Sequence, residues 1–138
     1  MDIESFKHSF DEIFLSELDR LLSRTKKRVH NTHIHGLLSH TYELAKNGKR
    51  IRPYVMALSY GAHTFEDAQE ISDQLVGIEL LHLFALVHDD IMDEALTRHG
   101  VASMNSFSEN CYEDLPNKNL QGKYEAILLG DLIFSFAY

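Results

Sequence analysis

Three aspartates stand close together after a long apolar run. The run covers residues 78–87 and is followed at once by Asp89, Asp90 and Asp93. Residues four apart share one face of a helix, so Asp89 and Asp93 would repel each other on a bare helix. Mg²⁺ would reverse that repulsion, because it takes oxygen ligands and is usually held by one or two carboxylates together with substrate phosphates. The spacing therefore predicts a magnesium–phosphate site on a helix, with a solvated acidic helix end as the alternative.

A basic segment lies earlier in the chain. Lys49, Arg50 and Arg52 fall within four residues, and Pro53 follows them. Proline is tolerated in the first turn of a helix, so a helix is expected to begin here. The free N–H groups of a helix N-terminus attract phosphate, Arg adds a planar pair of donors, and Lys adds a point charge. The segment therefore predicts a phosphate site, with a basic surface turn as the alternative.

Histidines occur in two settings. His82 lies seven residues before Asp89, which places it two helical turns away on the same face. We expect it to line the same cavity as the carboxylates, although a lone histidine on an apolar helix is usually a core residue. The histidines at positions 30, 33, 35 and 40 lie in a polar stretch. They are expected to be solvated rather than to bind a transition metal.

The apolar pattern predicts an all-α protein. Apolar residues recur at steps of three and four over residues 6–22, which indicates an amphipathic helix. Further helices are expected over about 36–46, 52–61, from 67 to beyond 89, and from 123 onward. Residues 98–122 contain scattered Gly, Pro, Asn and Ser and are predicted to form a long loop. The 138 residues fit a single domain with its own core.

Composition limits the classes of partner and compartment. The formal net charge of -8 argues against binding to nucleic acid. The single Cys111 cannot form an internal disulfide. The first residues lack the basic and apolar regions of a signal peptide. The apolar stretch from 126 to 138 is interrupted by Asp131 and is too short to span a bilayer, so a cytoplasmic protein without a transmembrane segment is expected.

Together these segments resemble the polyprenyl (trans-isoprenyl) diphosphate synthase family, which includes farnesyl and geranylgeranyl diphosphate synthases. The resemblance covers about residues 40–138 and rests on five segments in a fixed order, which read NGKRIRP (47–53), ELLH (79–82), DDIMD (89–93), RHG (98–100) and AILLGD (126–131). It implies an isoprenoid-synthase bundle of long helices around a central apolar cavity, present here only as its N-terminal portion.

The resemblance also implies a reaction, the head-to-tail condensation of isopentenyl diphosphate with an allylic diphosphate. Mg²⁺ held by Asp89 and Asp93 would stabilise the pyrophosphate as it leaves the allylic substrate. Asp90 and Arg98 complete the implied catalytic set, and Arg98 is similar to the arginine that grips the allylic diphosphate. An apolar cavity wall would keep water from the carbocation.

The other implied residues bind substrate. Lys49, Arg52 and His82 match family residues that hold isopentenyl diphosphate, and Arg50 and His99 are assigned to the same substrate set. In this family, bulk just before the aspartates limits product length. Those positions are taken here by a large residue, Phe84, and a small one, Ala85. By resemblance, the pair implies a short product.

Four departures from the family pattern bear on function. Asn47 replaces a glycine, and His99 replaces a second arginine. Histidine is shorter and mostly neutral at pH 7, so weaker binding of isopentenyl diphosphate is expected. The segment between Gly100 and Ala126 is longer than usual. The family's second aspartate-rich motif does not occur before Tyr138. We therefore expect the other half of the fold to be supplied in cis or in trans.

Three functions follow in order of preference. The first is a trans-prenyltransferase that works as a homodimer or as a heteromer with a completing chain. The second is a non-catalytic or regulatory subunit of a heteromeric prenyl diphosphate synthase, which the altered Asn47 and His99 favour slightly. The third is a terpene cyclase. It is disfavoured by Lys49, Arg52 and His82, because a cyclase has no second diphosphate to hold.

Overall fold

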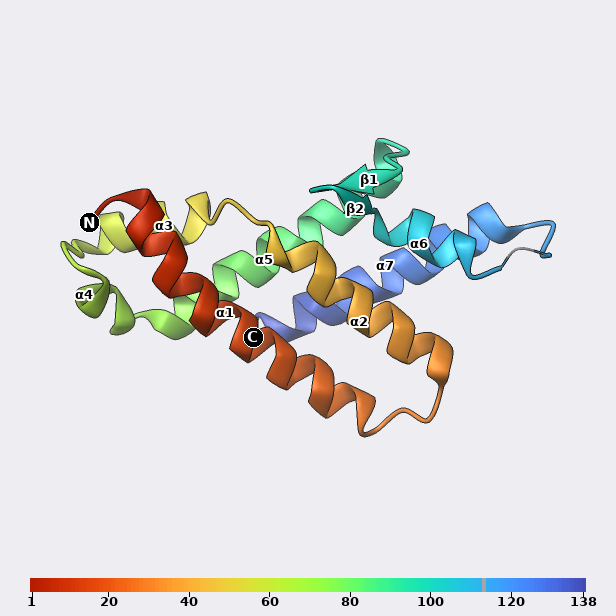
Figure 1. The fold of residues 1–138 in the computed structure, drawn as a ribbon, viewed down its shortest axis with the longest axis horizontal. Helices are drawn as coiled ribbons and strands as arrows, with labels where there is room; N and C mark the ends of the chain where they lie inside the picture. Colours follow the sequence, from red (N-terminus) through yellow and green to blue (C-terminus); the bar gives the residue numbers. More distant parts are fainter. Residues whose placement is uncertain (113) are drawn as a thin grey trace.

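A computed structural model describes residues 1–112 and 114–138 of the protein. Its elements are α1 (Ile3–Lys26), α2 (Thr32–Lys46), α3 (Ile51–Tyr60), α4 (Phe65–Gln69), α5 (Ser72–Met92), β1 (Thr97–Arg98), β2 (Val101–Ala102), α6 (Met104–Asn110) and α7 (Lys118–Phe136). The prediction of an all-α fold is confirmed, since the two short strands form one small hairpin. Figure 1 shows α1 and α2 as an antiparallel pair, with α5 and α7 packed together behind them.

Helix α1 supplies much of the core. Phe6, Phe10, Phe14, Leu18 and Leu22 repeat every four residues, and none is more than 2 % exposed. Each such side chain stabilises the fold by roughly 1.5–3 kcal/mol when it leaves water. The helix begins where its N-cap aspartate accepts a hydrogen bond from the first turn, and it ends in basic residues that suit the negative end of the helix dipole. The predicted amphipathic helix is therefore present and faces the core.

The remaining helix boundaries depend on caps that periodicity does not reveal. The expected long helix from residue 67 is two helices. Thr64 and Asp67 form a reciprocal capping box that starts α4, and a tight turn then separates α4 from α5 at Ser72. Helix α2 starts at residue 32 rather than 36, because the side chain of Asn31 accepts a hydrogen bond from Ile34 N at 3.1 Å.

The prediction of a long loop over residues 98–122 is wrong for most of that segment. It contains the β1–β2 hairpin, α6 and the first turn of α7. Ser103 caps α6, and Met104 is completely buried. Two of the residues that suggested a loop lie instead at a close contact between α6 and α7, where a Cβ on Gly122 would fall 2.6 Å from the carbonyl oxygen of Asn105. Small and polar residues thus serve close packing here.

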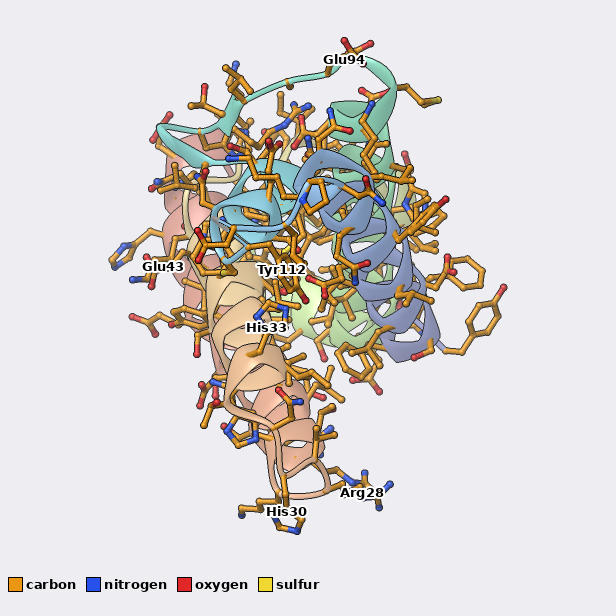
Figure 2. The ribbon with its side chains drawn as sticks, turned by 90° about the vertical axis from the view of Figure 1, so that its right-hand side faces the viewer. Arg28, His30, His33, Glu43, Glu94 and Tyr112 are labelled. Atoms are coloured by element: carbon orange, nitrogen blue, oxygen red, sulfur yellow. The ribbon has the colours of Figure 1, made fainter. Side chains whose placement is uncertain are left out.

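The prediction that the clustered histidines are solvated is wrong for three of the four. Nε2 of His33 lies 2.9 Å from Glu125 of α7, and the hydroxyl of Tyr112 contacts both. Burial raises the pKa of Glu125, but hydrogen bonds from Ser108, Tyr112 and His33 together outweigh that effect, and the net pKa falls below its ordinary value. Figure 2 shows His33 beside Tyr112, whereas the exposed His30 lies at the tip of the α1–α2 connection.

The other two histidines bond to backbone carbonyls. Nε2 of His35 lies 2.6 Å from the carbonyl oxygen of Val29 and helps to close the α1–α2 connection. His40 is buried, stacks on Phe107 with ring centroids 4.0 Å apart, and bonds to the carbonyl oxygen of Ala102 at 2.7 Å. These contacts hold α2 against α6 and the hairpin.

His40 makes stability depend on pH. Burial lowers the pKa of His40, so the folded chain holds it neutral while the unfolded chain binds a proton below about pH 6.5. We therefore expect stability to fall as pH drops from 7 toward 5. His40→Gln removes the titrating group and should flatten that decline. Urea unfolding at several pH values checks this, with the exposed His30→Gln as control. Equal pH slopes for His40→Gln and the unaltered protein would contradict it.

Candidate active site

The three aspartates have different environments at the end of α5. Asp89 and Asp93 are both exposed, and the backbone N–H of Asp93 donates to the carbonyl oxygen of Asp89 at 2.8 Å. Asp90 is only 1 % exposed. It lies on the buried stripe that contains Leu83 and Val87. Two carboxylates therefore face outward together, and the third is directed into the protein.

Asp90 holds Arg98. Oδ1 of Asp90 accepts hydrogen bonds from Nε of Arg98 at 2.9 Å and from its Nη2 at 2.5 Å. The hydrogen bonds that Arg98 donates to Asp90 raise the pKa of Arg98, and the nearby charges of Asp89 and Asp93 raise it further. The guanidinium is thus fixed by one carboxylate within electrostatic reach of the other two.

The β1–β2 hairpin carries Arg98 to this place. Arg98 pairs with Val101 across a two-residue turn in which His99 has φ 51° and Gly100 has φ 85°. Positive φ at both positions is the geometry of a type I′ turn, which matches the twist of a two-stranded ribbon. The side-chain amide of Asn47 donates to the carbonyl oxygen of His99 at 3.4 Å. The hairpin and the basic segment predicted to bind phosphate are therefore neighbours.

These elements enclose a cavity of about 210 Å³. Its charged or titratable lining comprises Lys49, Arg50, Arg52, Glu79, His82, Arg98 and His99. Leu44, Leu83 and Leu86 are among the apolar residues of its wall. Helix α3 begins at this cavity with Ile51, so the positive end of its dipole is at the rim. Cations and helix N–H groups together make the cavity suited to a phosphorylated ligand.

His82 and Arg52 form a pair within the cavity. Nη1 of Arg52 lies 2.8 Å from Nε2 of His82. Burial lowers the pKa of His82, and the positive charge of Arg52 lowers it further. The imidazole is therefore neutral at pH 7 and accepts the hydrogen bond through Nε2, which fixes the direction of the Arg52 side chain.

Arg50 lies in a different environment from its neighbours Lys49 and Arg52. Its side chain is 2 % exposed, whereas Lys49 and Arg52 are exposed. Its three guanidinium nitrogens donate to Asp11 Oδ1 at 2.6 Å, to Glu79 Oε1 at 2.7 Å and to a backbone carbonyl at 2.6 Å. The sequence assigned Arg50 to the substrate-binding set, whereas in the structure each of its guanidinium nitrogens donates to an acceptor within the protein.

The two residues expected to limit product length face different surroundings. Phe84 lies against His88 and against Phe134 of α7, with ring centroids 4.6 Å and 5.1 Å apart. Ala85 is exposed and stands one turn before Asp89 on the same face of α5. Ala85 is therefore the residue of this pair on the carboxylate face.

Two further residues of the site, Asp11 and Asp90, have roles that the sequence did not suggest. Asp11 was not expected at all, because α1 carries no motif and Asp11 is one of several acidic residues on an amphipathic helix. The burial of Asp90 could have been found, since it lies seven residues after Leu83 and three after Val87. Residues at these steps share a helix face, and that face is apolar.

The donor set at the end of α5 fits a hard cation. In the described part of the chain, no group of three or more His, Cys, Asp or Glu residues is arranged to hold a metal ion. Asp89 and Asp93 together still offer exposed carboxylate oxygens on one face. Mg²⁺ is commonly bound by one or two carboxylates, with substrate phosphates and water completing its shell. The pair therefore suits a magnesium ion shared with a phosphorylated ligand.

Residues 35–138 match the sequence profile of a family described as polyprenyl synthetase. The chain belongs to the polyprenyl synthetase family. Among similar proteins, a short chain isoprenyl diphosphate synthase of Methanocaldococcus jannaschii is 29 % identical over 132 residues, which cover 94 % of this chain and 34 % of that protein. A geranylgeranyl pyrophosphate synthase of Geoglobus acetivorans is 37 % identical over 95 residues, covering 69 % of this chain and 25 % of that protein.

A solved structure shares the fold. It is a geranylgeranyl pyrophosphate synthase from Corynebacterium glutamicum in complex with isoprenyl diphosphate and magnesium. The TM-score is 0.72 at 22 % identity, and the match covers 99 % of this chain and 40 % of that one. The polyprenyl synthetase segment described here thus has an isoprenoid-synthase fold and spans 40 % or less of the length of these three relatives.

Proposed function

We propose that this chain is the N-terminal portion of a trans-prenyltransferase that binds isopentenyl diphosphate beside an allylic diphosphate. The observation that carries the proposal is the position of Arg98, which lines the basic cavity and is held by Asp90 within reach of Asp89 and Asp93. One site gathers cations for a diphosphate. The other site offers carboxylates, which can bind a diphosphate only through a metal cation held between them. Two phosphorylated substrates would then lie side by side.

The basic cavity would hold isopentenyl diphosphate. Lys49 and Arg52 supply charge and N–H donors, and the N-terminus of α3 adds its dipole. His82 is neutral, so it adds no charge to the cavity, and its hydrogen bond with Arg52 fixes the direction of that side chain. His99 lines the cavity in place of a second arginine, so this site has one permanent charge fewer than the family pattern implies.

The carboxylate face would hold the allylic diphosphate. Mg²⁺ bound by Asp89 and Asp93 would neutralise the leaving pyrophosphate as its charge develops. Asp90 orients Arg98, whose guanidinium would grip a phosphate oxygen of the same substrate. Small Ala85, one turn earlier on this face, leaves room for the start of the prenyl chain, and Phe84 adds bulk toward α7. This arrangement agrees with a short product.

Exposed apolar side chains support a completing half. On α3, Ile51 is 48 % exposed, Val55 is 53 % exposed and Leu58 is 46 % exposed, while Leu128 of α7 is 65 % exposed. Apolar surface of this kind is usually covered. We propose that further polypeptide covers it, in cis or from a partner chain, and closes the cavity against water. No helix in the described residues has the length and apolar character needed to cross a membrane.

The alternative of a non-catalytic subunit differs in turnover rather than in binding. A subunit that only tunes a partner could share the proposed binding residues of α3, α5 and the hairpin and still form no product. Product formation from labelled isopentenyl diphosphate, measured with the completing chain present, separates the two. Product lost in Asp89→Ala assemblies supports the enzyme, and product that is unaffected supports the subunit.

The basic cavity is tested directly by calorimetric titration with isopentenyl diphosphate in the absence of divalent cations. Arg52→Ala should weaken binding by about tenfold or more, because a charge-assisted contact contributes about 1.5–3 kcal/mol. Lys49→Ala should act in the same direction. Lys27→Ala removes an exposed cation just beyond the end of α1 and serves as the control. If all three variants bind alike, the cavity is not the isopentenyl diphosphate site.

A further inference from the structure

A buried ion cluster lies directly under the basic cavity. Arg50 is its centre, with Asp11 of α1 on Nε and Glu79 of α5 on Nη1. The guanidinium also lies 4.5 Å from the ring centroid of Phe14 in α1. We infer that Asp11 is a positioning residue for the diphosphate cavity, acting through Arg50 to hold Lys49 and Arg52. The inference rests on the proposed function of that cavity, and it extends the site into a helix outside residues 35–138, the part that matches the family profile.

Charge balance shows why Arg50 is not available to a ligand. Lys7 lies 3.0 Å from Oδ2 of Asp11, and Arg50 lies 2.6 Å from Oδ1. With Glu79, the cluster contains two cations and two anions, so its net charge is zero. A diphosphate in the cavity would therefore gain little attraction from Arg50, and its attraction would come from Lys49 and Arg52.

The backbone around Arg50 is shaped by this cluster. Arg50 has φ 55°, a left-handed conformation that a residue with a Cβ rarely adopts. It is also the N-cap of α3, so its position sets the start of that helix and the direction of Arg52. A Cβ on Gly48 would fall 2.2 Å from Nη1 of Arg50. The glycine therefore leaves the space that the guanidinium occupies, and Lys49 lies between these two fixed points.

The cluster is poorly arranged for stability alone. Oε2 of Glu79 is buried and has no hydrogen-bond partner among the described residues. An unmatched buried carboxylate oxygen is costly, and buried ion pairs are often no more stable than apolar residues of similar volume. Glu79 also lines the cavity. A costly cluster at the base of a binding cavity is better explained by positioning than by stability.

The experiment measures binding of isopentenyl diphosphate without divalent cations for Asp11→Ala and Asp11→Asn. Removing a negative charge near the cavity would by itself strengthen the binding of an anion. Positioning predicts the opposite: about a tenfold loss for Asp11→Ala. Asparagine retains an acceptor for Nε of Arg50, so Asp11→Asn should remain within about twofold of the unaltered chain. Glu17→Gln, which alters an ion pair elsewhere on α1, is the matched control.

A second variant approaches the cluster from the other side. Gly48→Ala should displace Arg50 and weaken binding in the same way, whereas Gly36→Ala, whose Cβ would have nothing within 4 Å, should not. Helical circular dichroism confirms folding of each variant, and Gly48→Ala supplies the test if Asp11→Ala does not fold. If the unaltered chain fails to bind, both proposals are overturned. Binding that responds to Arg52→Ala but is unchanged or stronger in Asp11→Ala and Gly48→Ala overturns the positioning role alone.

Discussion

Asp90→Asn is expected to lower the free energy of unfolding by about 3 kcal/mol, whereas Asp89→Asn should leave it within about 0.5 kcal/mol. Asp90 is 1 % exposed and accepts two hydrogen bonds from Arg98, so its loss leaves the guanidinium without its counter-charge. Asp89 is exposed near the C-terminus of α5, where a negative charge opposes the helix dipole. Neutralising Asp89 therefore removes little that stabilises the fold.

Asp89→Asn should impair ligand binding more than Asp90→Asn does, which is the reverse of their order in stability. Asp89→Asn removes a proposed Mg²⁺ ligand and should weaken Mg²⁺-dependent binding of an allylic diphosphate on the order of 100-fold, the scale of losing one aligned electrostatic contact. Asp90→Asn should weaken that binding by about tenfold, because Arg98 is loosened while both outward carboxylates remain. Binding of isopentenyl diphosphate without Mg²⁺ should be little changed in Asp89→Asn.

Chemical unfolding and calorimetric titration of the two variants test this pair of expectations. The binding titration is run with Mg²⁺ and again with a chelator. Equal stability of Asp89→Asn and Asp90→Asn would show that the buried ion pair does not support the fold. If Asp89→Asn keeps its Mg²⁺-dependent affinity, the metal is not held by the outward carboxylates.

Helical phase accounts for what the sequence could predict. The stripe in α1 repeats every four residues without interruption, so its buried face follows from spacing alone. The common face of His82, Ala85 and Asp89 also follows from spacing along α5. Motif order then related these positions to the basic segment, which the structure places beside the hairpin that carries Arg98.

The features that the sequence did not predict depend on contacts between elements distant in the chain. Arg50 and Arg52 look equivalent in sequence, and only packing against Asp11, thirty-nine residues earlier, buries the first of them. Helix α6 has no regular apolar repeat. It forms because Ser103 caps it and because its backbone meets a glycine in α7. The contact of Arg50 with Asp11 and that of α6 with Gly122 have no local signal, since each depends on a partner brought near by the fold.

Gly122→Ala is expected to destabilise the protein by about 2 kcal/mol, although glycine to alanine in a helix normally stabilises by about 0.5–1 kcal/mol. The reason is the contact between α7 and α6. The new Cβ would lie 2.6 Å from the carbonyl oxygen of Asn105 and 3.0 Å from the backbone nitrogen of Glu109. Backbone atoms cannot turn aside as a side chain can, so α6 must move as a unit.

Gly36→Ala is the matched control, because a methyl group on this α2 glycine would have nothing within 4 Å and should give the usual stabilisation. Thermal unfolding of both variants measures the contrast, with the melting temperature expected to fall by several degrees in Gly122→Ala and to rise slightly in Gly36→Ala. The effect should extend to the site, because Ser103 at the start of α6 donates to the carbonyl oxygen of Ala95 at 2.6 Å and so ties α6 to the chain leading into the hairpin. A displaced α6 would shift Arg98 and weaken Mg²⁺-dependent binding of an allylic diphosphate. If Gly122→Ala is as stable as Gly36→Ala, the close approach of α6 and α7 is not required by the fold.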